Sequence, residues 1–443
     1  MPAAPEPPPT PATTGAPAAG RPVDDSDLVP TRERLAAAVA EAPPEEEYGP
    51  VHDFATDFDH TDEAWVADPY PIWDELRETC PIAHTERYGG AWLPTRHADV
   101  SAIANDTENF TSRSVVVSRG RPPIELAPAG IAPPITSDPP FHAAARRLLL
   151  SVMSPKAVAD LEPSTRAYCR ELIAAMEGRD VVDAAVEYAQ HIPVRVIANM
   201  LGLPESDGDR FRGFVHGILE GVSKPLEERV EVFLELFEYL TPQVEARQAE
   251  PRDDLISMLI ASEIDGEPIT PFHVTRTVAL LLIAGIDTTW SAIGASIWHL
   301  ADHPDDRERI VRDPALLPTA IEEFLRAYAP VTMARLVRDD FEYEGCPMKA
   351  EEWVLLSFPA ANRDPEAFDR PDEVLIERAP NRHAAFGLGA HRCAGSHLAR
   401  MEIRVALEEW LAAFPSFRLA DPDAVRWSAG QVRGPRALAV EVS

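Results

Sequence analysis

Apolar residues recur at helical spacing along much of the chain, and one stretch is apolar on every face. Thr270 and Pro271 form a good helix start, with a capping hydroxyl and proline at the first helical position. The next strong breaker is His303-Pro304, so the pattern predicts one helix of about 33 residues, roughly 50 Å long. Residues 279–286, in its middle, have no polar face, which predicts burial at the centre of the protein.

Shorter elements are predicted on both sides of this helix. Residues 82–86 and 91–95 flank Gly89-Gly90 and predict a β-hairpin, and residues 331–338 predict a strand that crosses the floor of a pocket. The other helices are predicted over residues 70–79, around 98–105, after 138–142, and as a series through 161–262 with breaks near Pro193, Pro204, Pro225, Pro242 and Pro251.

The N-terminal part has a different composition. Residues 1–20 hold seven prolines and a surplus of alanine without apolar periodicity, and an acidic segment follows. Such a sequence buries too little apolar surface to offset its ordering entropy, so we predict a disordered extension over residues 1–48. No linker-like break follows, which predicts one folded domain over residues 49–443. Residues 114–130, rich in Val, Pro and Gly, are typical of a binding loop.

The strongest chemical signal is the sequence Phe-Gly-Leu-Gly-Ala-His-Arg-Cys-Ala-Gly at residues 386–395, directly before an amphipathic helix that runs through Trp410. Its three glycines allow the backbone to turn sharply and approach a neighbour closely. Cys393 therefore lies on a loop at a helix N-terminus. The helix dipole and unpaired N–H groups there are expected to lower the pKa of its thiol.

Three interpretations of Cys393 remain open from these residues. It could be a buried core thiol beside a turn. It could join His391 and His397 in a zinc site, although such sites usually recruit paired cysteines and Cys80, Cys169 and Cys346 are isolated. It could also be a single thiolate that binds haem iron.

The long helix contains residues that a buried helix does not need. Gly285 costs about 1 kcal/mol relative to alanine, and the charged Asp287 precedes Thr288 and Thr289. A kink with a satisfied polar pair is one explanation. Alternatively, Ala284 and Gly285 leave room for a flat cofactor, and a threonine hydroxyl opens the helix locally. Asp287 would then supply protons and Thr288 would hold oxygen.

Phe386, Gly389, Cys393 and Gly395 resemble the haem-ligand signature of the cytochrome P-450 family, Phe-x-x-Gly-x-x-x-Cys-x-Gly. Residues 284–289 resemble the family's Ala/Gly-Gly-x-Asp/Glu-Thr-Thr/Ser element. The resemblance implies a mostly α fold with small β-sheets, a single helical prism around a buried haem b (iron protoporphyrin IX). It also implies that Cys393 is the iron ligand and that Asp287 and Thr288 are catalytic.

The same resemblance implies roles for residues outside the two motifs. Haem contacts would come from His142, Arg146, Arg335, His391, Phe386, Gly387, Ala284, Gly285 and Gly395. The substrate pocket would be lined by Val331, Thr332, Met333, Ala334, Ala284 and Thr289. Glu323 and Arg326 match the family's Glu-x-x-Arg structural lock. One departure is Phe141, where the family commonly has an acidic residue.

Charge and cysteine content limit the partners. The formal net charge is 41 − 73 = −32, which argues against nucleic acid and anionic membranes as partners. Four scattered cysteines fit a reducing cytoplasm, and the longest apolar run, residues 278–286, is too short to span a bilayer. We expect a cytoplasmic monomer.

The resemblance implies a monooxygenase that inserts one atom of O₂ into a small-to-medium apolar substrate. A hydrogen peroxide-driven peroxygenase and a haem-thiolate sensor are alternatives. No flavin or iron–sulfur region is evident, so electrons are expected from a ferredoxin with an NAD(P)H-dependent ferredoxin reductase. Arg382, Arg392, Arg400 and Arg404 would form a basic docking face in an acidic surface, unless they pair with local acids.

Overall fold

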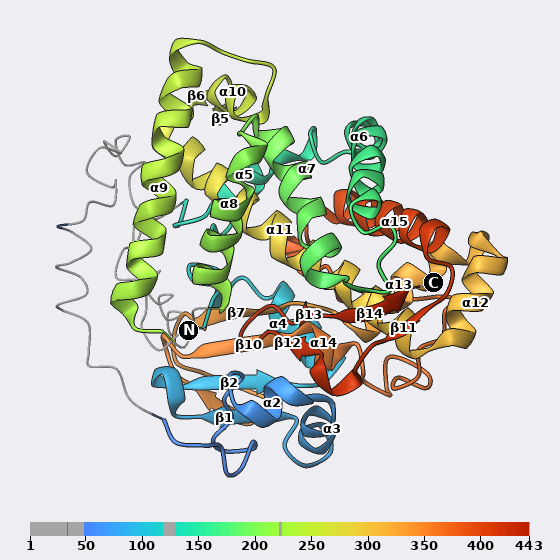
Figure 1. Ribbon diagram of the computed structural model, residues 1–443. Helices are drawn as coiled ribbons and strands as arrows, with labels where there is room; N and C mark the ends of the chain where they lie inside the picture. Colours follow the sequence, from blue (N-terminus) through green and yellow to red (C-terminus); the bar gives the residue numbers. More distant parts are fainter. Residues whose placement is uncertain (1–32, 34–47, 118–128, 221–223, 443) are drawn as a thin grey trace, which may run out of the picture.

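The computed structural model describes residue 33 and residues 48–117, 129–220 and 224–442 (Figure 1). The predicted disordered extension, apart from residues 33 and 48, and the middle of the predicted binding loop lie outside the described residues. Helices fill most of the molecule, and a small sheet occupies one end, with β1 (Ile82–Thr85) and β2 (Ala91–Pro94) at the bottom of Figure 1. The predicted mostly helical fold with small sheets is confirmed.

The centre of the fold is α11 (Pro271–Asp302), a helix of 32 residues. Its N-cap is Thr270, whose side chain accepts a hydrogen bond from the backbone of His273, and Pro271 occupies the first turn. The helix packs against α7 (His191–Leu201), α9 (Leu226–Ala249) and α15 (Ser396–Ala413). By length and composition it could cross a membrane, yet 72% of its most apolar window is buried inside the protein. The predicted central helix is therefore confirmed.

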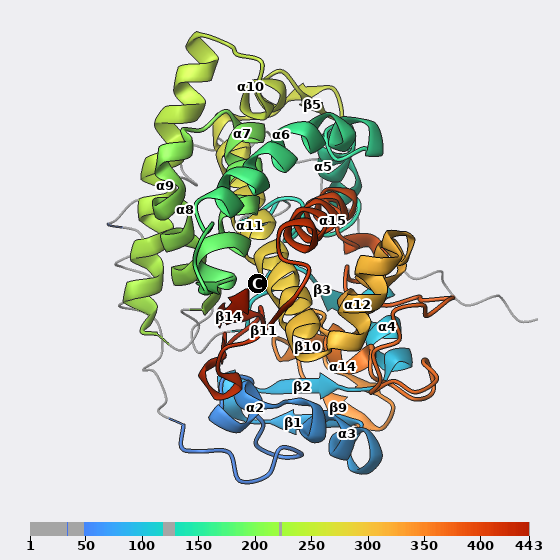
Figure 2. The same ribbon diagram turned by 45° about the vertical axis from the view of Figure 1, so that its right-hand side comes forward.

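The main sheet has the strand order β1-β2-β10-β7-β3, where β10 is Trp353–Ser357, β7 is Thr332–Val337 and β3 is Phe110–Thr111. β1 and β2 form the predicted antiparallel hairpin. β7 pairs with β10 so that Arg335 lies opposite Val354. Figure 2 shows α11 and α15 side by side above this sheet, with a contact between them. The candidate site residues lie between α11, α15 and β7 of this sheet.

The remaining helices surround α11 and α15. The predicted break at Pro242 is wrong, because α9 continues through it, and Pro163 likewise lies inside α6. Each proline removes one backbone N–H, and packing of the rest of the helix outweighs that loss. The other helices are α2 (Glu63–Ala67), α3 (Tyr70–Thr79), α4 (His97–Asn105), α5 (Phe141–Leu150), α6 (Pro155–Ala174), α8 (Gly208–Val215), α10 (Leu255–Ile260), α12 (Pro304–Arg312), α13 (Leu317–Ala327) and α14 (Phe358–Ala361).

Short strands complete the fold. β14 joins β11 and β4 in a three-stranded sheet, and three two-stranded ribbons pair β5 with β6, β8 with β9 and β12 with β13. Their bounds are β4 (Val181–Asp183), β5 (Glu263–Ile264), β6 (Glu267–Pro268), β8 (Phe341–Tyr343), β9 (Cys346–Met348), β11 (Phe417–Leu419), β12 (Arg426–Trp427), β13 (Pro435–Ala437) and β14 (Ala439–Val442).

A buried ion pair ties α13 to the loops before α15. The side chains of Glu323 and Arg326 are both 0% exposed, with Nε of Arg326 2.9 Å from Oε2 of Glu323. Arg326 also donates to the carbonyls of Asn362, Pro371 and Glu373. Several segments far apart in sequence are thereby fixed by one pair. This arrangement positions the chain that leads into the cysteine loop.

Candidate functional site

A cavity of about 410 Å³ lies inside the molecule, lined by residues of α11, α15, β7 and the loop before α15. Cys393 and Thr288 both line it. Ala284 lies in the middle of the buried α11 and is nevertheless exposed, because it faces this cavity. Two motifs about a hundred residues apart in the sequence are therefore brought to one internal space.

The cysteine loop is held by its own backbone. The N–H of Cys393 donates to the carbonyl of Phe386 at 2.7 Å. Gly387 and Gly389 have φ values of 71° and 67°, in the left-handed region that glycine favours. A side chain at Gly389 would also place its Cβ 2.4 Å from the carbonyl oxygen of Ala104. The loop therefore needs glycine here to dock on α4.

Cys393 is solvent-accessible and lines the cavity, although many protein atoms surround its thiol. Burial among protein atoms raises its pKa, while a hydrogen bond from the backbone of Gly395 and the charges of Arg146 and Arg392 act in the opposite direction. The expectation of a lowered pKa is therefore wrong, because desolvation outweighs the helix N-terminus. A coordinated cation deprotonates a thiol outright, so the loop suits a metal ligand better than a free nucleophile.

On the opposite helix, the hydroxyl of Thr288 donates to the carbonyl of Ala284 at 2.8 Å. This is the bond that the sequence predicted, and it leaves the hydroxyl oxygen on the cavity side. Gly285 lines the cavity as expected, and the structure gives this glycine a second reason. A Cβ there would lie 2.5 Å from Cδ1 of Ile197, so this glycine allows α7 to pack closely, whereas Ala284 leaves the room in the cavity.

Asp287 does not line the cavity. Its side chain is 0% exposed and its Oδ1 lies 2.6 Å from Nη2 of Arg436 on β13. Arg436 also donates to Ser291 and Glu220. Burial raises the pKa of Asp287 to about 6, although Arg436 acts to lower it. Sequence reasoning missed Arg436 because it lies 149 residues away on a C-terminal strand and belongs to no motif.

At one edge of the cavity four nitrogen-rich side chains converge, and we call His142, Arg146, Arg335 and His391 the donor edge. The rings of His142 and His391 are 4.1 Å apart. Burial lowers the pKa of Arg335 to about 10, and burial and neighbouring Arg335 lower the pKa of His391 to about 2. The donor edge thus combines two arginine cations with two neutral imidazoles.

The donor edge contains no acidic side chain, and its contacts go to neutral groups: Arg146 donates to the carbonyl of Arg392, and Nε2 of His391 lies 3.0 Å from the hydroxyl of Ser112. Arg335 is 6% exposed, and within the described part of the chain its side chain donates one hydrogen bond, to the carbonyl of Ala334. Nε2 of His142 is buried without a partner among the described residues. Burying a cation without an opposite charge beside it costs roughly several kcal/mol. The donor edge is therefore complementary to an anionic group. Carboxylates on a flat cofactor fit it.

Strand alternation decides which residues of β7 reach the cavity. Val331, Met333 and Arg335 line it, whereas Thr332 and Ala334 do not. Side chains alternate between the two faces of a strand. The prediction that four consecutive residues, 331–334, line the pocket is therefore wrong. Ala334 is 0% exposed and packs in the hydrophobic core below the sheet. Thr289 of α11 lines the cavity as expected.

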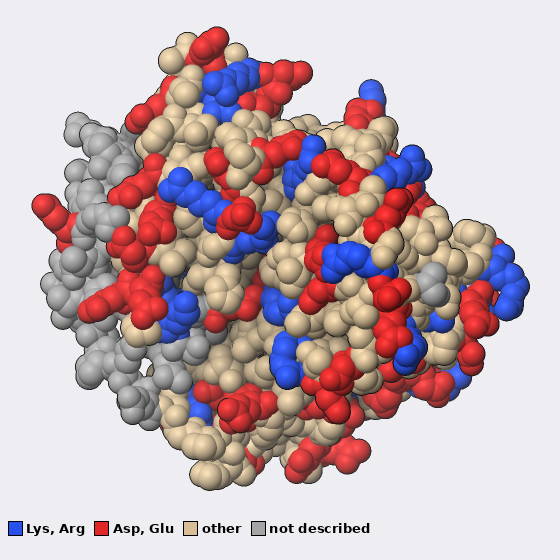
Figure 3. Space-filling model, in the orientation of Figure 1, with Lys and Arg blue, Asp and Glu red and all other residues tan. Residues whose placement is uncertain are grey.

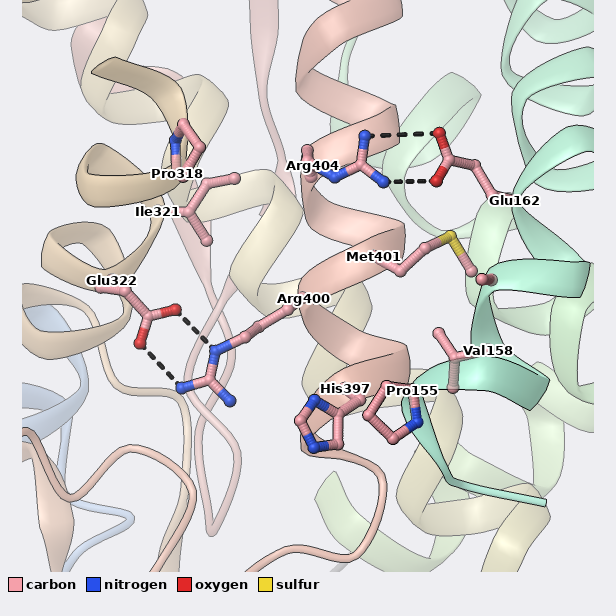
Figure 4. A pocket seen from close by; sticks show the side chains of 11 residues that line it. Pro155, Val158, Glu162, Pro318, Ile321, Glu322, His397, Arg400, Met401 and Arg404 are labelled. Carbon is pink, nitrogen blue, oxygen red and sulfur yellow. Dashed lines mark hydrogen bonds and ion pairs between the residues drawn. The ribbon is translucent and has the colours of Figure 1, made fainter. Parts of the chain in front are cut away.

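Another pocket, of about 290 Å³, lies on the outer face of α15 (Figure 4). Arg400 pairs with Glu322 of α13, and Arg404 pairs with Glu162 of α6. These two arginines are therefore neutralised within the fold, which corrects the predicted four-residue basic face. Arg382 and Arg392 are exposed and have no ion pair within the described part of the chain. On the face drawn in Figure 3, acidic and basic side chains are interspersed.

The zinc interpretation finds no support in the geometry. His397 lies on the outer pocket of α15, whereas Cys393 and His391 face the internal cavity. Among the described residues no group of three His, Cys, Asp or Glu side chains is placed to hold a metal ion. One inward thiol, a small helix face opposite it and a donor edge for carboxylates together define a site for a planar, thiolate-bound cofactor.

Comparisons with known proteins agree with this class. Residues 210–423 match the family model of cytochrome P-450. The mycinamicin IV hydroxylase/epoxidase of Micromonospora griseorubida is 33% identical, over 83% of this chain and 94% of that protein. The nocardicin C N-oxygenase of Nocardia uniformis subsp. tsuyamanensis is 36% identical, over 84% of this chain and 95% of that protein.

A solved structure has the same fold. CYP109E1 from Bacillus megaterium, in complex with testosterone, superposes with a TM-score of 0.79 at 30% identity, over 85% of this chain and 98% of that one. The chain therefore belongs to the cytochrome P-450 family and is an oxidoreductase of the monooxygenase type. The family implies a haem cofactor, and the thiol, the small helix face and the donor edge fit that group.

Proposed function

We propose that Cys393 would bind the iron of a haem b, that the donor edge would hold its propionates, and that this site inserts one oxygen atom from O₂ into an organic substrate. The observation that carries the proposal is the placement of the Cys393 thiol and the Thr288 hydroxyl on the same internal cavity. A bound haem supplies the oxygen chemistry. The protein holds it, excludes water and delivers protons.

Thr288 and Asp287 have separate tasks in this proposal. Thr288 lines the cavity with its side chain while its O–H donates to the carbonyl of Ala284. Asp287 stores a proton at Oδ2, the oxygen that has no partner among the described residues. Because Asp287 faces Arg436 and not the cavity, its proton reaches Thr288 when the carboxyl leaves Arg436 or through a water molecule. Arg436 is thus a positioning residue for the acid.

The substrate is an apolar molecule of small to medium size. Apart from the donor edge, the side of the cavity toward α9 and β7 is mainly apolar, with Phe233, Phe237, Val331 and Met333 among its lining residues. The similar proteins act on or bind different compounds, namely mycinamicin IV, nocardicin C and testosterone. This variety favours apolar enclosure over one conserved polar contact as the basis of binding.

A cytoplasmic ferredoxin, reduced by an NAD(P)H-dependent reductase, is the proposed electron donor. Arg382 and Arg392 are the exposed basic residues nearest in sequence to Cys393. They lie in a chain with a net charge of −32, so they would steer a small acidic protein toward the cysteine loop. Arg400 and Arg404 are held by acids and take a smaller part.

The test is Cys393→Ala in the haem-loaded protein. The thiolate-dependent red-shifted band of the reduced carbon monoxide complex should vanish, because no other cysteine lines the cavity among the described residues. Cys169→Ala is the matched control: its thiol is buried between helices, and the variant should keep the band. A red-shifted band in Cys393→Ala would show that another residue binds the iron.

A further inference from the structure

Glu402 of α15 is a buried acid that the proposed function does not use. Glu402 is 1% exposed and lines the internal cavity. Oε2 of Glu402 is buried without a hydrogen-bond partner among the described residues. Glu402 lies outside the cysteine motif of residues 386–395, which assigns it no role.

The position of Glu402 follows from helix periodicity. Gly395, Ala399 and Glu402 recur at intervals of four and three residues and line the cavity. His397 and Arg400 lie on the opposite stripe and line the outer pocket in Figure 4. Glu402 therefore projects inward, from the same helix that follows the cysteine loop.

No cation compensates this carboxyl group. The other acids near the end of α15, Glu408 and Glu409, are paired with Arg166, and Glu409 also with Arg170. No ion pair involves Glu402 in the described ranges. Asp287 on α11 is equally buried but is held by Arg436. The two helices thus bring one paired and one unpaired acid close to the same internal space.

The neighbouring elements offer no basic group to Glu402 either. Cys169 on α6 is buried, and burial raises its pKa to about 12, so it is a neutral thiol. Most charged groups on the elements packed against α15 have other partners. On α6, Arg166 and Arg170 pair with Glu408 and Glu409, and Lys156 is exposed. On α13, Glu322 pairs with Arg400 and Arg326 with Glu323. On α7, Arg195 pairs with Glu171 and Glu205, and His191 contacts Arg212. On α11, Asp287 pairs with Arg436, His299 contacts Tyr328 and Asp306, Arg276 donates to the carbonyl of Gly130, and burial lowers the pKa of His273 to about 4. Tyr188 donates to the carbonyl of Ala406.

We infer that Glu402 is a neutral carboxylic acid in the working protein, and that loss of its proton lowers the reduction potential of the cofactor on the Cys393 side of the cavity. An isolated buried carboxylate is strongly disfavoured, so the group stays protonated. Burial raises the pKa of Glu402 well above its usual range. Ionisation would add a negative charge at the wall of the cavity that Cys393 also lines, in a medium of low dielectric, which stabilises the oxidised state.

Infrared spectroscopy of the haem-loaded wild-type protein tests the protonation state directly. With ¹³C-labelled glutamate, a protonated carboxyl band that shifts with the label should be present near pH 7. Glu402→Gln should lose this band, and Glu409→Gln, which removes a paired acid of the same helix, should keep it. Absence of the band in the wild type, or its persistence in Glu402→Gln, would overturn the inference. This measurement does not depend on which residue binds the iron.

The second readout is the reduction potential as a function of pH, and it rests on the proposed haem site. In the wild type the potential should fall as the carboxyl band disappears at alkaline pH, and Glu402→Gln should lack that step. A Glu402→Gln variant with a raised potential already near pH 7 would mean that the wild-type group is ionised. If Glu402→Gln does not fold, the wild-type protein alone tests the coupling, because the carboxyl band and the reduction potential should then change over the same pH range. A potential that does not change while the band titrates refutes the coupling.

Discussion

Oδ1 of Asp287 lies 2.6 Å from Nη2 of Arg436, so the acid of the central helix is tied to a strand near the C-terminus. The guanidinium of Arg436 also lies 4.2 Å from the ring centre of Trp290 and bonds Glu220 at 2.6 Å. Glu220 in turn lies 3.2 Å from His216, whose side chain is 61% exposed. A polar chain therefore leads from the surface to an acid behind the cavity wall.

The first prediction is a pH dependence of stability that belongs to Asp287. Its pKa is about 6 in the folded protein and about 3.9 in an unfolded chain. The folded state therefore binds more protons between these values, and stability falls as pH rises through this window, by about 3 kcal/mol at most. Thermal unfolding between about pH 4 and pH 7 should show this fall in the wild type and not in Asp287→Asn.

Arg436→Gln extends the same test. Arg436 lowers the pKa of Asp287, so its removal should move the fall in stability to higher pH. Arg418→Gln, which removes an exposed arginine paired with Glu441 on another strand, should leave the window in place. An unchanged window in Arg436→Gln would show that the ion pair does not control the acid.

Thr288→Ala should divert consumed NADH into hydrogen peroxide while haem and substrate binding remain nearly intact. The hydroxyl faces the cavity, so its loss removes a group that acts on oxygen and not one that holds the helix. Thr275→Ala is the matched control, because Thr275 makes the same kind of bond to Pro271 on the same helix without lining the cavity. The ratio of product to NADH should fall in the first variant only. Equal ratios would contradict the role of Thr288.

The ion pair between Glu323 and Arg326 predicts a loss of stability and not of a chemical step. Glu323→Gln leaves a fully buried guanidinium with one acid fewer, which should destabilise the fold by about 3–5 kcal/mol. Glu322→Gln on the same helix removes a partner of an arginine that is 29% exposed and should cost about 1 kcal/mol or less. Chemical unfolding and haem content measure the difference. Equal losses in both variants would show that burial of the pair has no special weight.

Local patterns predicted the elements that carry their own signals. Thr270-Pro271 fixed the start of α11, and the cysteine loop and Thr288 could be assigned from short motifs. Contacts between distant segments could not be predicted, because Arg436 and Ile197 belong to no motif and meet α11 only in the fold. The alternation of β7 was predictable in principle, since period 2 excludes Thr332 and Ala334 from the face of Met333.

Arg392 and Arg400 differ in a way that sequence could not show. Both lie close to Cys393 in sequence, yet Nε of Arg400 is 2.6 Å from Glu322 and its guanidinium covers the ring of Phe386 at 4.3 Å. Arg392 is exposed and has no ion pair within the described residues. A docking role for an acidic ferredoxin should therefore depend on Arg392, whereas Arg400 should matter for the structure of the cysteine loop.

Arg392→Glu should slow reduction of the haem by the ferredoxin and flatten its dependence on salt, because rim charges act mainly on association and are screened over about 8–10 Å at physiological ionic strength. Substrate titrations should not change. Arg252 is an exposed arginine on the loop before α10, away from α15. Arg252→Glu makes the same change of charge, and its haem should be reduced at the wild-type rate. Stopped-flow reduction across a salt series measures both. A wild-type rate in Arg392→Glu at low salt would place the docking site on another face.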